Sequence, residues 1–257
     1  MLHRIVEGSG PRVVLAHGFT QTLASWEGLA VRLRPRWRVA RADLPGHGGS
    51  GAVRADLPGA ARLLGEAGGR AAYVGYSLGG RVCLRLALDR PDLVGALVLV
   101  GASPGIRDPA ARAERRAADE ALAAGIERDG VEAFLDRWLA GPLFATLAPE
   151  LAGRPARLAN TAAGLAAALR LLGAGAQEPL WDRLATLRPP VLLLTGAADA
   201  KFTALAGQMA ATIGPRARTA LVPGAGHAVC LEQPEAVGEL IEQFLRSGRA
   251  HEPPWRR

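Results

Sequence analysis

The fold of this chain is decided by the stretch AAYVGYSLGG, residues 71–80. Its apolar first part, 71–74, predicts a buried strand, and the residues after it, 81–88, predict a helix. Ser77 then stands on a sharp turn between the two, where the flanking glycines remove Cβ atoms that would clash. The pentapeptide GYSLG at residues 75–79 is weak evidence on its own, because a glycine-rich turn can contain it by coincidence. Its place between a predicted strand and a predicted helix makes it a strong signal for a serine hydroxyl exposed above a sheet.

Short runs rich in Val, Leu and Ala recur on both sides of this turn. They alternate with glycine-containing turns and longer amphipathic stretches, which is typical of a parallel sheet covered by helices on both faces. The predicted strands are residues 13–16, 37–42, 71–74, 96–100, 191–195 and 220–222. Ligands of such sheets bind beyond the carboxyl ends of the strands. The sequence therefore predicts an α/β fold with a mostly parallel sheet.

A long stretch without any strand-like segment separates the fourth predicted strand from the fifth. It spans about ninety residues, whereas an ordinary crossover between parallel strands needs far fewer. Its predicted helices are residues 109–124, 131–139 and 161–172. We expect an inserted helical cap that holds the substrate-selecting surface. The predicted division is a core of residues 1–102 and 182–246, a cap of residues 103–181, and a flexible tail of residues 247–257 after a helix over 236–245.

Two further residues stand where partners of Ser77 are expected, in loops after later strands. Asp199 follows the strand 191–195, and His227 follows the strand 220–222. In this order an imidazole can accept the serine proton, and a carboxylate can fix the imidazole tautomer. Each residue alone has an ordinary alternative, since an Asp in a turn caps backbone amides and a lone His is most often structural. Their joint order and placement favour a catalytic triad.

The loop after the first strand, HGF at residues 17–19, supplies a further part of such a site. A backbone N–H from this loop and the N–H of Leu78 could together hold a developing oxyanion. His17 and His47 are interpreted as structural loop residues. The histidines show no metal-ligand spacing, and no glycine-rich dinucleotide or phosphate loop is present. The sequence implies neither a metal nor a cofactor.

Arginines near these residues point to the charge of the ligand. Arg81 lies four residues after Ser77, one turn along the predicted helix and on about the same face. It could add a positive charge beside the positive helix end, or it could form a structural salt bridge. Arg112, Arg115 and Arg116 cluster on the first cap helix, mostly on a solvated face. One of them turned inward would favour an anionic substrate.

The composition excludes several classes of protein. With 257 residues, 49% hydrophobic and 21% charged, the chain belongs to the ordinary globular class. The formal charge of +7 comes from scattered arginines, with Lys201 as the single lysine. No basic stripe, aromatic interleaving or finger motif supports nucleic-acid binding.

Apolar runs and cysteines in the sequence also indicate the cellular compartment of the protein. No apolar run has the length of a membrane span or a signal peptide. Cys83 and Cys230 lie far apart in apolar sequence, which favours buried thiols over a disulfide and fits a reducing compartment. We expect a cytoplasmic protein without a membrane span.

From residue 17 to 244 the chain resembles the α/β-hydrolase superfamily. Within it, the sequence is similar to the family of 2-succinyl-6-hydroxy-2,4-cyclohexadiene-1-carboxylate synthases of menaquinone biosynthesis. Of the shared motifs, DLPGHGGS occurs widely in hydrolases. The arginine that follows Gly79 and Gly80, the RAER run and the DAKF run are far more selective. The motifs are DLPGHGGS at 43–50, VGYSLGGR at 74–81, SPG at 103–105 with RAER at 112–115, PLF at 142–144 and DAKF at 199–202.

The resemblance implies roles for individual residues. Ser77, Asp199 and His227 form its triad, and the backbone amides of Phe19 and Leu78 form its oxyanion hole. The residues that it implies as substrate contacts are Tyr76, Arg81, Arg115 and Trp138.

One position departs from the family pattern. The family has a further cap arginine just before an Asn that resembles Asn160, but this chain has Ala159 there and Arg157 two residues earlier. The sequence therefore leaves open whether Arg157 makes a third carboxylate contact.

The implied reaction is that of a carbon–oxygen lyase. The family eliminates pyruvate from 2-succinyl-5-enolpyruvyl-6-hydroxy-3-cyclohexene-1-carboxylate, starting with proton abstraction, for which a triad and an oxyanion hole can serve. We expect a small anionic substrate, no cofactor, no nucleic-acid partner, and a monomer or homodimer. The main alternative is a carboxylesterase or C–C bond hydrolase acting on a small ester or diketone, since fold and triad do not fix the reaction. A receptor that keeps the pocket without turnover is the non-enzymatic alternative.

Overall fold

The chain folds around one mixed sheet. The computed structural model describes residues 1–249. Within them a seven-stranded sheet has the order β1-β3-β2-β4-β5-β6-β7. Strands β2 to β7 run parallel, and β1 pairs antiparallel with β3 at one edge. The strands are β1 (Arg4–Glu7), β2 (Arg12–Ala16), β3 (Arg38–Ala42), β4 (Ala71–Tyr76), β5 (Val94–Val100), β6 (Val191–Gly196) and β7 (Ala217–Val222).

The six strands predicted from apolar runs are confirmed, with ends that shift by up to three residues. Strand β1 was not predicted. Three of its four residues are exposed, so it lacks the buried apolar run that marks the others. Its place in the sheet comes from pairing with β3, in which Arg4 lies opposite Ala42.

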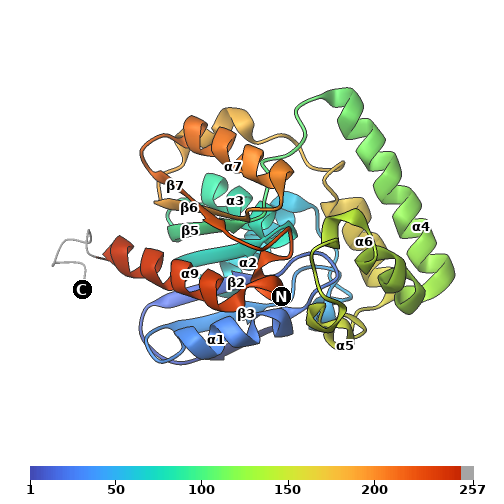
Figure 1. Ribbon diagram of the computed structural model, residues 1–257, viewed down its shortest axis with the longest axis horizontal. Helices are drawn as coiled ribbons and strands as arrows, with labels where there is room; N and C mark the ends of the chain where they lie inside the picture. Colours follow the sequence, from blue (N-terminus) through green and yellow to red (C-terminus); the bar gives the residue numbers. More distant parts are fainter. Residues whose placement is uncertain (250–257) are drawn as a thin grey trace.

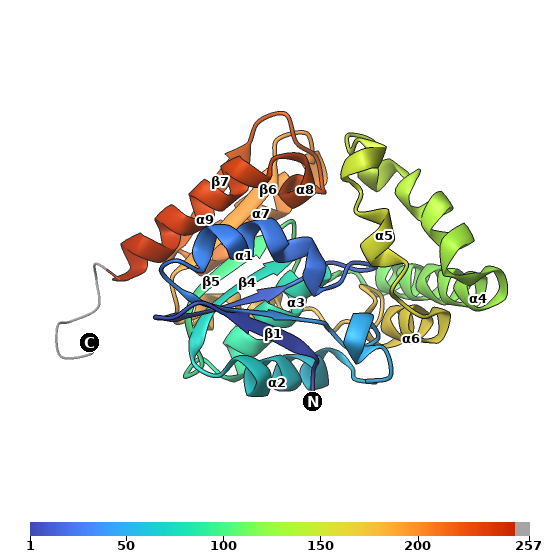
Figure 2. The same ribbon diagram turned by 90° about the horizontal axis from the view of Figure 1, so that it is seen from below.

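Helices cover both faces of the sheet, as predicted (Figures 1 and 2). Successive strand residues point to opposite faces, so Val13 and Leu15 of β2 join the core beneath α1 and α9, while Val14 and Ala16 join the opposite core. The first core contains α1 (Glu27–Leu33) and α9 (Pro234–Arg249), and the second contains α2 (Leu57–Gly68), α3 (Leu78–Asp89) and α7 (Ala200–Ile213).

The stretch between β5 and β6 is helical, as its composition predicts. Figures 1 and 2 show α4 (Pro109–Leu139), α5 (Arg154–Arg157) and α6 (Ala162–Leu172) gathered to one side of the sheet. They have their own apolar cluster, in which Ile126 and Leu135 of α4 meet Leu165 and Leu169 of α6. The boundaries predicted for a cap domain, 103–181, remain a prediction.

The helical segments differ in detail from those predicted. The segment expected at 109–124 continues up to Gly130, where φ of 82° and ψ of 170° interrupt the helix. Glycine adopts such a backbone without steric cost, so the break lies there rather than after residue 124. The short helix α5 was not predicted, because Pro155 and its charged neighbours give no helical periodicity.

The C-terminal prediction is partly wrong. Helix α9 continues to Arg249, so residues 247–249 are helical and not part of a tail. Residues 250–257 of the predicted tail lie outside the described residues. Of the helices in residues 1–249, none is both long and apolar enough to cross a membrane.

Candidate active site

Ser77 sits on the predicted turn between β4 and α3. Its φ of 49° and ψ of −107° are strained for a residue with a side chain. The glycines around it are required by close backbone approach. A Cβ at Gly75 would lie 2.4 Å from the Gly79 carbonyl oxygen, and a Cβ at Gly79 would lie 2.1 Å from that of Ala16. The sharp turn therefore depends on the glycine spacing seen in the sequence.

The structure brings together the three residues predicted as a triad. They follow β4, β6 and β7, whose carboxyl ends share one edge of the sheet. The distance from His227 Nε2 to Ser77 Oγ is 3.3 Å, and that from His227 Nδ1 to Asp199 Oδ2 is 2.8 Å. Because His227 is 4% exposed, its ring is held in place by the surrounding protein. This arrangement allows His227 to accept the Ser77 proton while Asp199 orients the ring.

The environment of Asp199 favours its charged form. Burial alone would raise the pKa of this carboxyl, but hydrogen bonds from His227 and the Phe202 amide outweigh it, and the pKa is lowered from 3.8. The Phe202 N–H donates to Asp199 Oδ1 at 3.1 Å, as expected for a residue that caps α7. The carboxylate therefore serves two purposes, one in the helix cap and one toward His227.

The predicted oxyanion residues both line the pocket beside Ser77. Leu78 is the first residue of α3, and an N–H at that position has no partner within its helix. Phe19 belongs to the loop after β2, and its ring lies 5.6 Å from that of Trp138. Both residues thus lie at the pocket, and the convergence of their amides on an oxyanion remains a prediction.

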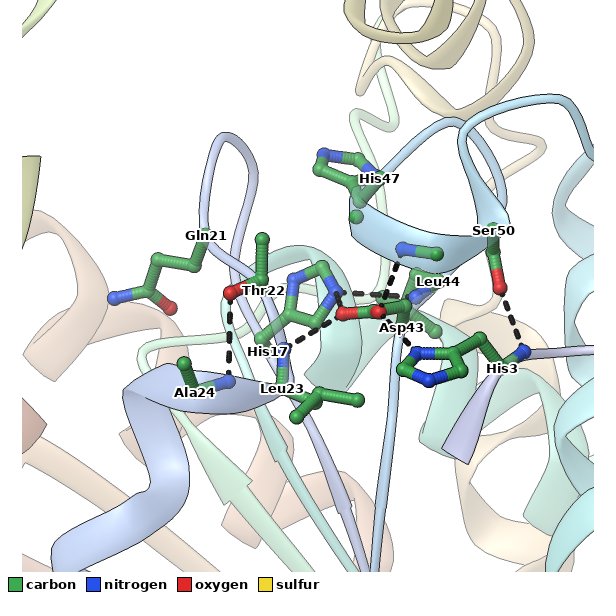
Figure 3. A network of polar contacts seen from close by, with 12 residues as sticks. His3, His17, Gln21, Thr22, Leu23, Ala24, Asp43, Leu44, His47 and Ser50 are labelled. Carbon is green, nitrogen blue, oxygen red and sulfur yellow. Dashed lines mark hydrogen bonds and ion pairs between the residues drawn. The ribbon is translucent and has the colours of Figure 1, made fainter. Parts of the chain in front are cut away.

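Figure 3 shows how the loop after β2 is fixed against the loop after β3. Asp43 accepts from the Leu23 amide at 2.7 Å and from the Gly49 amide at 2.9 Å, and its Oδ2 lies 2.8 Å from His3 Nδ1. His17 Nε2 accepts from the Leu44 amide at 3.0 Å. The DLPGHGGS motif therefore organises the loop that presents Phe19.

His17 and His47 are structural, as predicted. Both are fully buried, and burial lowers the pKa of each, that of His47 to about 3. Neutral His47 donates from Nδ1 to the Pro45 carbonyl at 3.0 Å and accepts the Thr20 amide at Nε2, 3.3 Å away. These contacts hold the backbone next to Phe19.

The pocket above Ser77 is lined by cations and apolar groups. Arg81, Arg115 and Lys201 contribute the positive charges, and no Asp or Glu of residues 1–249 lines the pocket. Arg115 is the inward arginine of α4, and its Nε donates to Asp119 at 2.7 Å. Lys201 was not singled out as a site residue from its motif. The lining residues are Phe19, Ser77, Leu78, Arg81, Gly101, Ser103, Arg115, Trp138, Leu143, Ala168, Leu169, Leu172, Gly173, Ala174, Lys201, Phe202 and His227.

Trp138 lines the pocket with its indole. The Nε1 atom is buried and has no hydrogen-bond partner in the described part of the chain. Trp138 therefore contributes to the pocket wall, while its Nε1 atom is covered by other parts of the protein.

Two other residues predicted as substrate contacts lie outside the lining. Tyr76 is 4% exposed and packs 5.5 Å from the His227 ring, and burial raises the pKa of its phenol. Arg157 is 2% exposed and donates from Nε to the Ala152 carbonyl at 2.7 Å and from Nη1 to the Thr20 hydroxyl. In this structure Arg157 supports the loop after β2 and does not reach the pocket.

The described residues contain no group of three or more His, Cys, Asp or Glu side chains arranged to hold a metal ion. Cys83 is buried and Cys230 is partly buried, and both are free thiols.

Comparison with known proteins agrees with this geometry. The model of the alpha/beta hydrolase family matches residues 13–240. A Bacillus subtilis (strain 168) protein, provisionally named a 2-succinyl-6-hydroxy-2,4-cyclohexadiene-1-carboxylate synthase, is 36% identical over 249 residues, 91% of this chain and 90% of its own. The protein of that name from Salmonella schwarzengrund (strain CVM19633) is 34% identical over 261 residues, 95% of this chain and 97% of its own.

A solved structure is also similar to this chain over nearly its whole length. MenH from S. aureus superposes with a TM-score of 0.89 at 29% identity, covering 97% of this chain and 100% of that chain. The matches confirm the fold and the resemblance predicted from the motifs. The chain belongs to the α/β-hydrolase family, and within it the chain is similar over nearly its whole length to the 2-succinyl-6-hydroxy-2,4-cyclohexadiene-1-carboxylate synthases.

Proposed function

We propose that this enzyme eliminates pyruvate from 2-succinyl-5-enolpyruvyl-6-hydroxy-3-cyclohexene-1-carboxylate in menaquinone biosynthesis. The observation that carries the proposal is the pocket above Ser77, which presents Arg81, Arg115 and Lys201 with no acidic lining residue in the described chain. A substrate with three carboxylates fits such a charge distribution. The names of the relatives at 36% and 34% identity support the same reaction.

In the proposed mechanism, Ser77 acts as a base. His227 accepts the proton of the Ser77 hydroxyl, and the serine oxygen removes a proton from a ring carbon of the substrate. The electron pair left on that carbon forms a new C=C bond, the existing ring C=C bond shifts by one position, and the C–O bond to the enolpyruvyl group breaks. The enolate of pyruvate leaves with those electrons and becomes pyruvate by taking up one proton at its methylene carbon, which balances the proton that His227 gives up. The amides of Phe19 and Leu78 stabilise the enolate-like charge that develops on the way.

The cationic side chains have separate positions around the reacting centre. Arg81 lies on the first turn of α3 next to Ser77, so it is placed to bind a carboxylate close to the reacting carbon. Arg115 and Trp138 come from α4, and Lys201 comes from the start of α7. Residues 103–181 act as a cap in this proposal, because their helices supply the wall opposite the sheet.

The test is direct. Incubation of the purified enzyme with the enolpyruvyl substrate should release one pyruvate per substrate, measured with lactate dehydrogenase and NADH. Efficient hydrolysis of neutral esters without pyruvate release would instead favour a carboxylesterase, whose chemistry the same triad and oxyanion amides can perform. Binding of the substrate with neither pyruvate release nor ester hydrolysis would favour a receptor.

A further inference from the structure

Arg81 has a neutral hydrogen-bond partner, in contrast to Arg41 and Arg115, which form ion pairs. Arg81 Nη1 donates to Oε1 of Gln177, a neutral amide, at 3.0 Å. No carboxylate in residues 1–249 forms an ion pair with Arg81, whereas Arg115 is paired with Asp119 and the buried Arg41 with Glu7 and Glu27. The hydrogen-bonded partner of Arg81 is therefore neutral, and Arg81 forms no ion pair within the described residues.

The carboxylate that acts electrostatically on Arg81, Asp119, is hydrogen-bonded to other groups. Asp119 is 2% exposed, and its Oδ1 accepts from Arg115 Nε at 2.7 Å. Its Oδ2 accepts from the Gly175 amide at 3.2 Å. Burial, and next the charge of Arg115, lower the pKa of Arg81 to about 10 despite the opposing effect of the Asp119 carboxylate, so Arg81 is still cationic at neutral pH.

The side chain of Gln177 is buried against the segment that contains Gly105. It is 2% exposed, and its Nε2 faces Gly105, where an added Cβ would lie 3.0 Å away. Its loop is anchored to the same segment, because the Leu180 amide donates to the Pro104 carbonyl at 2.7 Å and Trp181 Nε1 donates to the Gly105 carbonyl at 2.9 Å. The amide therefore has little freedom to turn away from Arg81.

The amide of Gln177 has one buried donor that is not satisfied. Nε2 of Gln177 is buried without a hydrogen-bond partner in the part of the chain that the structure describes. A buried donor without a partner reduces stability. A glutamate of nearly the same shape would form an ion pair with Arg81 and neutralise its charge, and its second oxygen would take the buried place of Nε2.

We propose that Gln177 is a positioning residue that holds Arg81 in the pocket by a neutral hydrogen bond and thereby keeps its positive charge available for a substrate carboxylate. The inference rests on the proposed carboxylate-binding role of Arg81. It gives a reason for a neutral amide, rather than a carboxylate, as the hydrogen-bond partner of Arg81.

The test compares two nearly isosteric variants. Gln177→Glu keeps a hydrogen-bond acceptor for Arg81 but neutralises its charge, whereas Gln177→Met keeps a similar volume and removes both the hydrogen bond to Arg81 and the unpaired Nε2 donor. We expect Gln177→Glu to raise the KM for the tricarboxylate substrate at least about tenfold, more than Gln177→Met, with kcat changed less. If Gln177 served only the structure, changes in KM would follow the loss of stability in the two variants, and Gln177→Glu would not weaken binding beyond that loss.

Binding is measured separately from turnover. Calorimetric titration of the same substrate into Ser77→Ala, with and without each Gln177 substitution, gives dissociation constants that do not depend on catalysis. Gln208→Glu on the exposed face of α7 is the matched control for the change in net charge, and we expect it to change affinity less than twofold. Thermal unfolding of each variant separates loss of affinity from loss of structure.

The outcomes distinguish the two proposals. If Arg81→Gln weakens binding but Gln177→Glu does not, or if Gln177→Met is the more damaging change, the role of Gln177 is overturned and the proposed reaction stands. If no pyruvate is released by the wild type, the proposed reaction fails, while the order of dissociation constants still decides the role of Gln177. If the substrate does not bind Ser77→Ala at all, both proposals fall.

Discussion

The guanidinium of Arg157 donates a hydrogen bond to the side-chain oxygen of Thr20, a residue 137 positions earlier in the chain. Thr20 has a φ of 67°, and its carbonyl accepts from Asn160 Nδ2 at 2.7 Å. Residues of the helical insertion thus hold the strained backbone next to Phe19. An arginine that the family pattern left open as a ligand contact instead supports the proposed oxyanion loop.

We predict that Arg157→Met destabilises the protein and lowers kcat. The substitution removes hydrogen bonds to the Thr20 hydroxyl and the Ala152 carbonyl from a buried site, which should lower the free energy of unfolding by about 2–3 kcal/mol. Urea unfolding and steady-state kinetics measure the two effects. Arg154→Met on the same short helix is the control, because its ion pair with Asp136 is exposed and should matter little. Equal effects of both substitutions would contradict the support role.

The strain at Ser77 gives a second prediction. In residues 1–249, Thr20 and Ser77 are the residues other than glycine with positive φ. Glycine adopts the backbone of Ser77 without penalty, so Ser77→Gly should be more stable than Ser77→Ala by about 1 kcal/mol, although both are inactive. At Ser103, which also lines the pocket, the glycine variant should be the less stable one. Denaturant unfolding of the four variants tests this, and the same order at both positions would refute it.

The sheet could be predicted because burial on both faces requires apolar runs, and such runs are visible in sequence. β1 could not, since pairing with β3 and not apolar content puts Arg4–Glu7 in the sheet. The juxtaposition of Ser77, Asp199 and His227 followed from strand order, because parallel strands end at one edge. Their catalytic roles remain proposals.

The residues around the pocket could be predicted less completely from the sequence. Gln177 meets Arg81 across 96 positions, and no motif marks it. Its contact depends on how the loop after α6 packs against residues 104–105, which no local pattern encodes. Lys201 lies in the DAKF run, whose selectivity was a signal that could have marked it as a pocket residue.

Acid should destabilise the protein through its buried histidines. Burial lowers the pKa of His47 from 6.5 to about 3, so between these pH values the unfolded chain binds more protons than the folded one. The free energy of unfolding therefore decreases as pH falls from 6.5, with His47 contributing up to about 1.4 kcal/mol per pH unit. His47→Gln should flatten the slope between pH 6.5 and pH 5 in urea titrations. Parallel slopes for the two proteins would exclude this contribution.

The proposed triad should act as a unit. Ser77→Ala, His227→Ala and Asp199→Asn should each lower the rate of pyruvate release by about three to six orders of magnitude. The triple variant should be little worse than Ser77→Ala, because each loss removes the same function. A triple variant that is slower by the product of the three factors would mean that the residues act independently. Thermal unfolding checks that the fold persists.

The last prediction separates a base role of Ser77 from a nucleophilic one. Hydrolysis of an ester by a triad passes through an acyl group on the serine, whereas proton abstraction by the same oxygen leaves the enzyme unmodified. The 3.3 Å between Ser77 Oγ and His227 Nε2 permits either chemistry, so geometry alone does not choose. Rapid-quench mass spectrometry during turnover of the enolpyruvyl substrate should find the mass of the unmodified protein at every time point. A p-nitrophenyl ester that acylates Ser77 serves as the positive control for detection. A stoichiometric adduct on Ser77 with the enolpyruvyl substrate would rule out the elimination mechanism and favour hydrolysis.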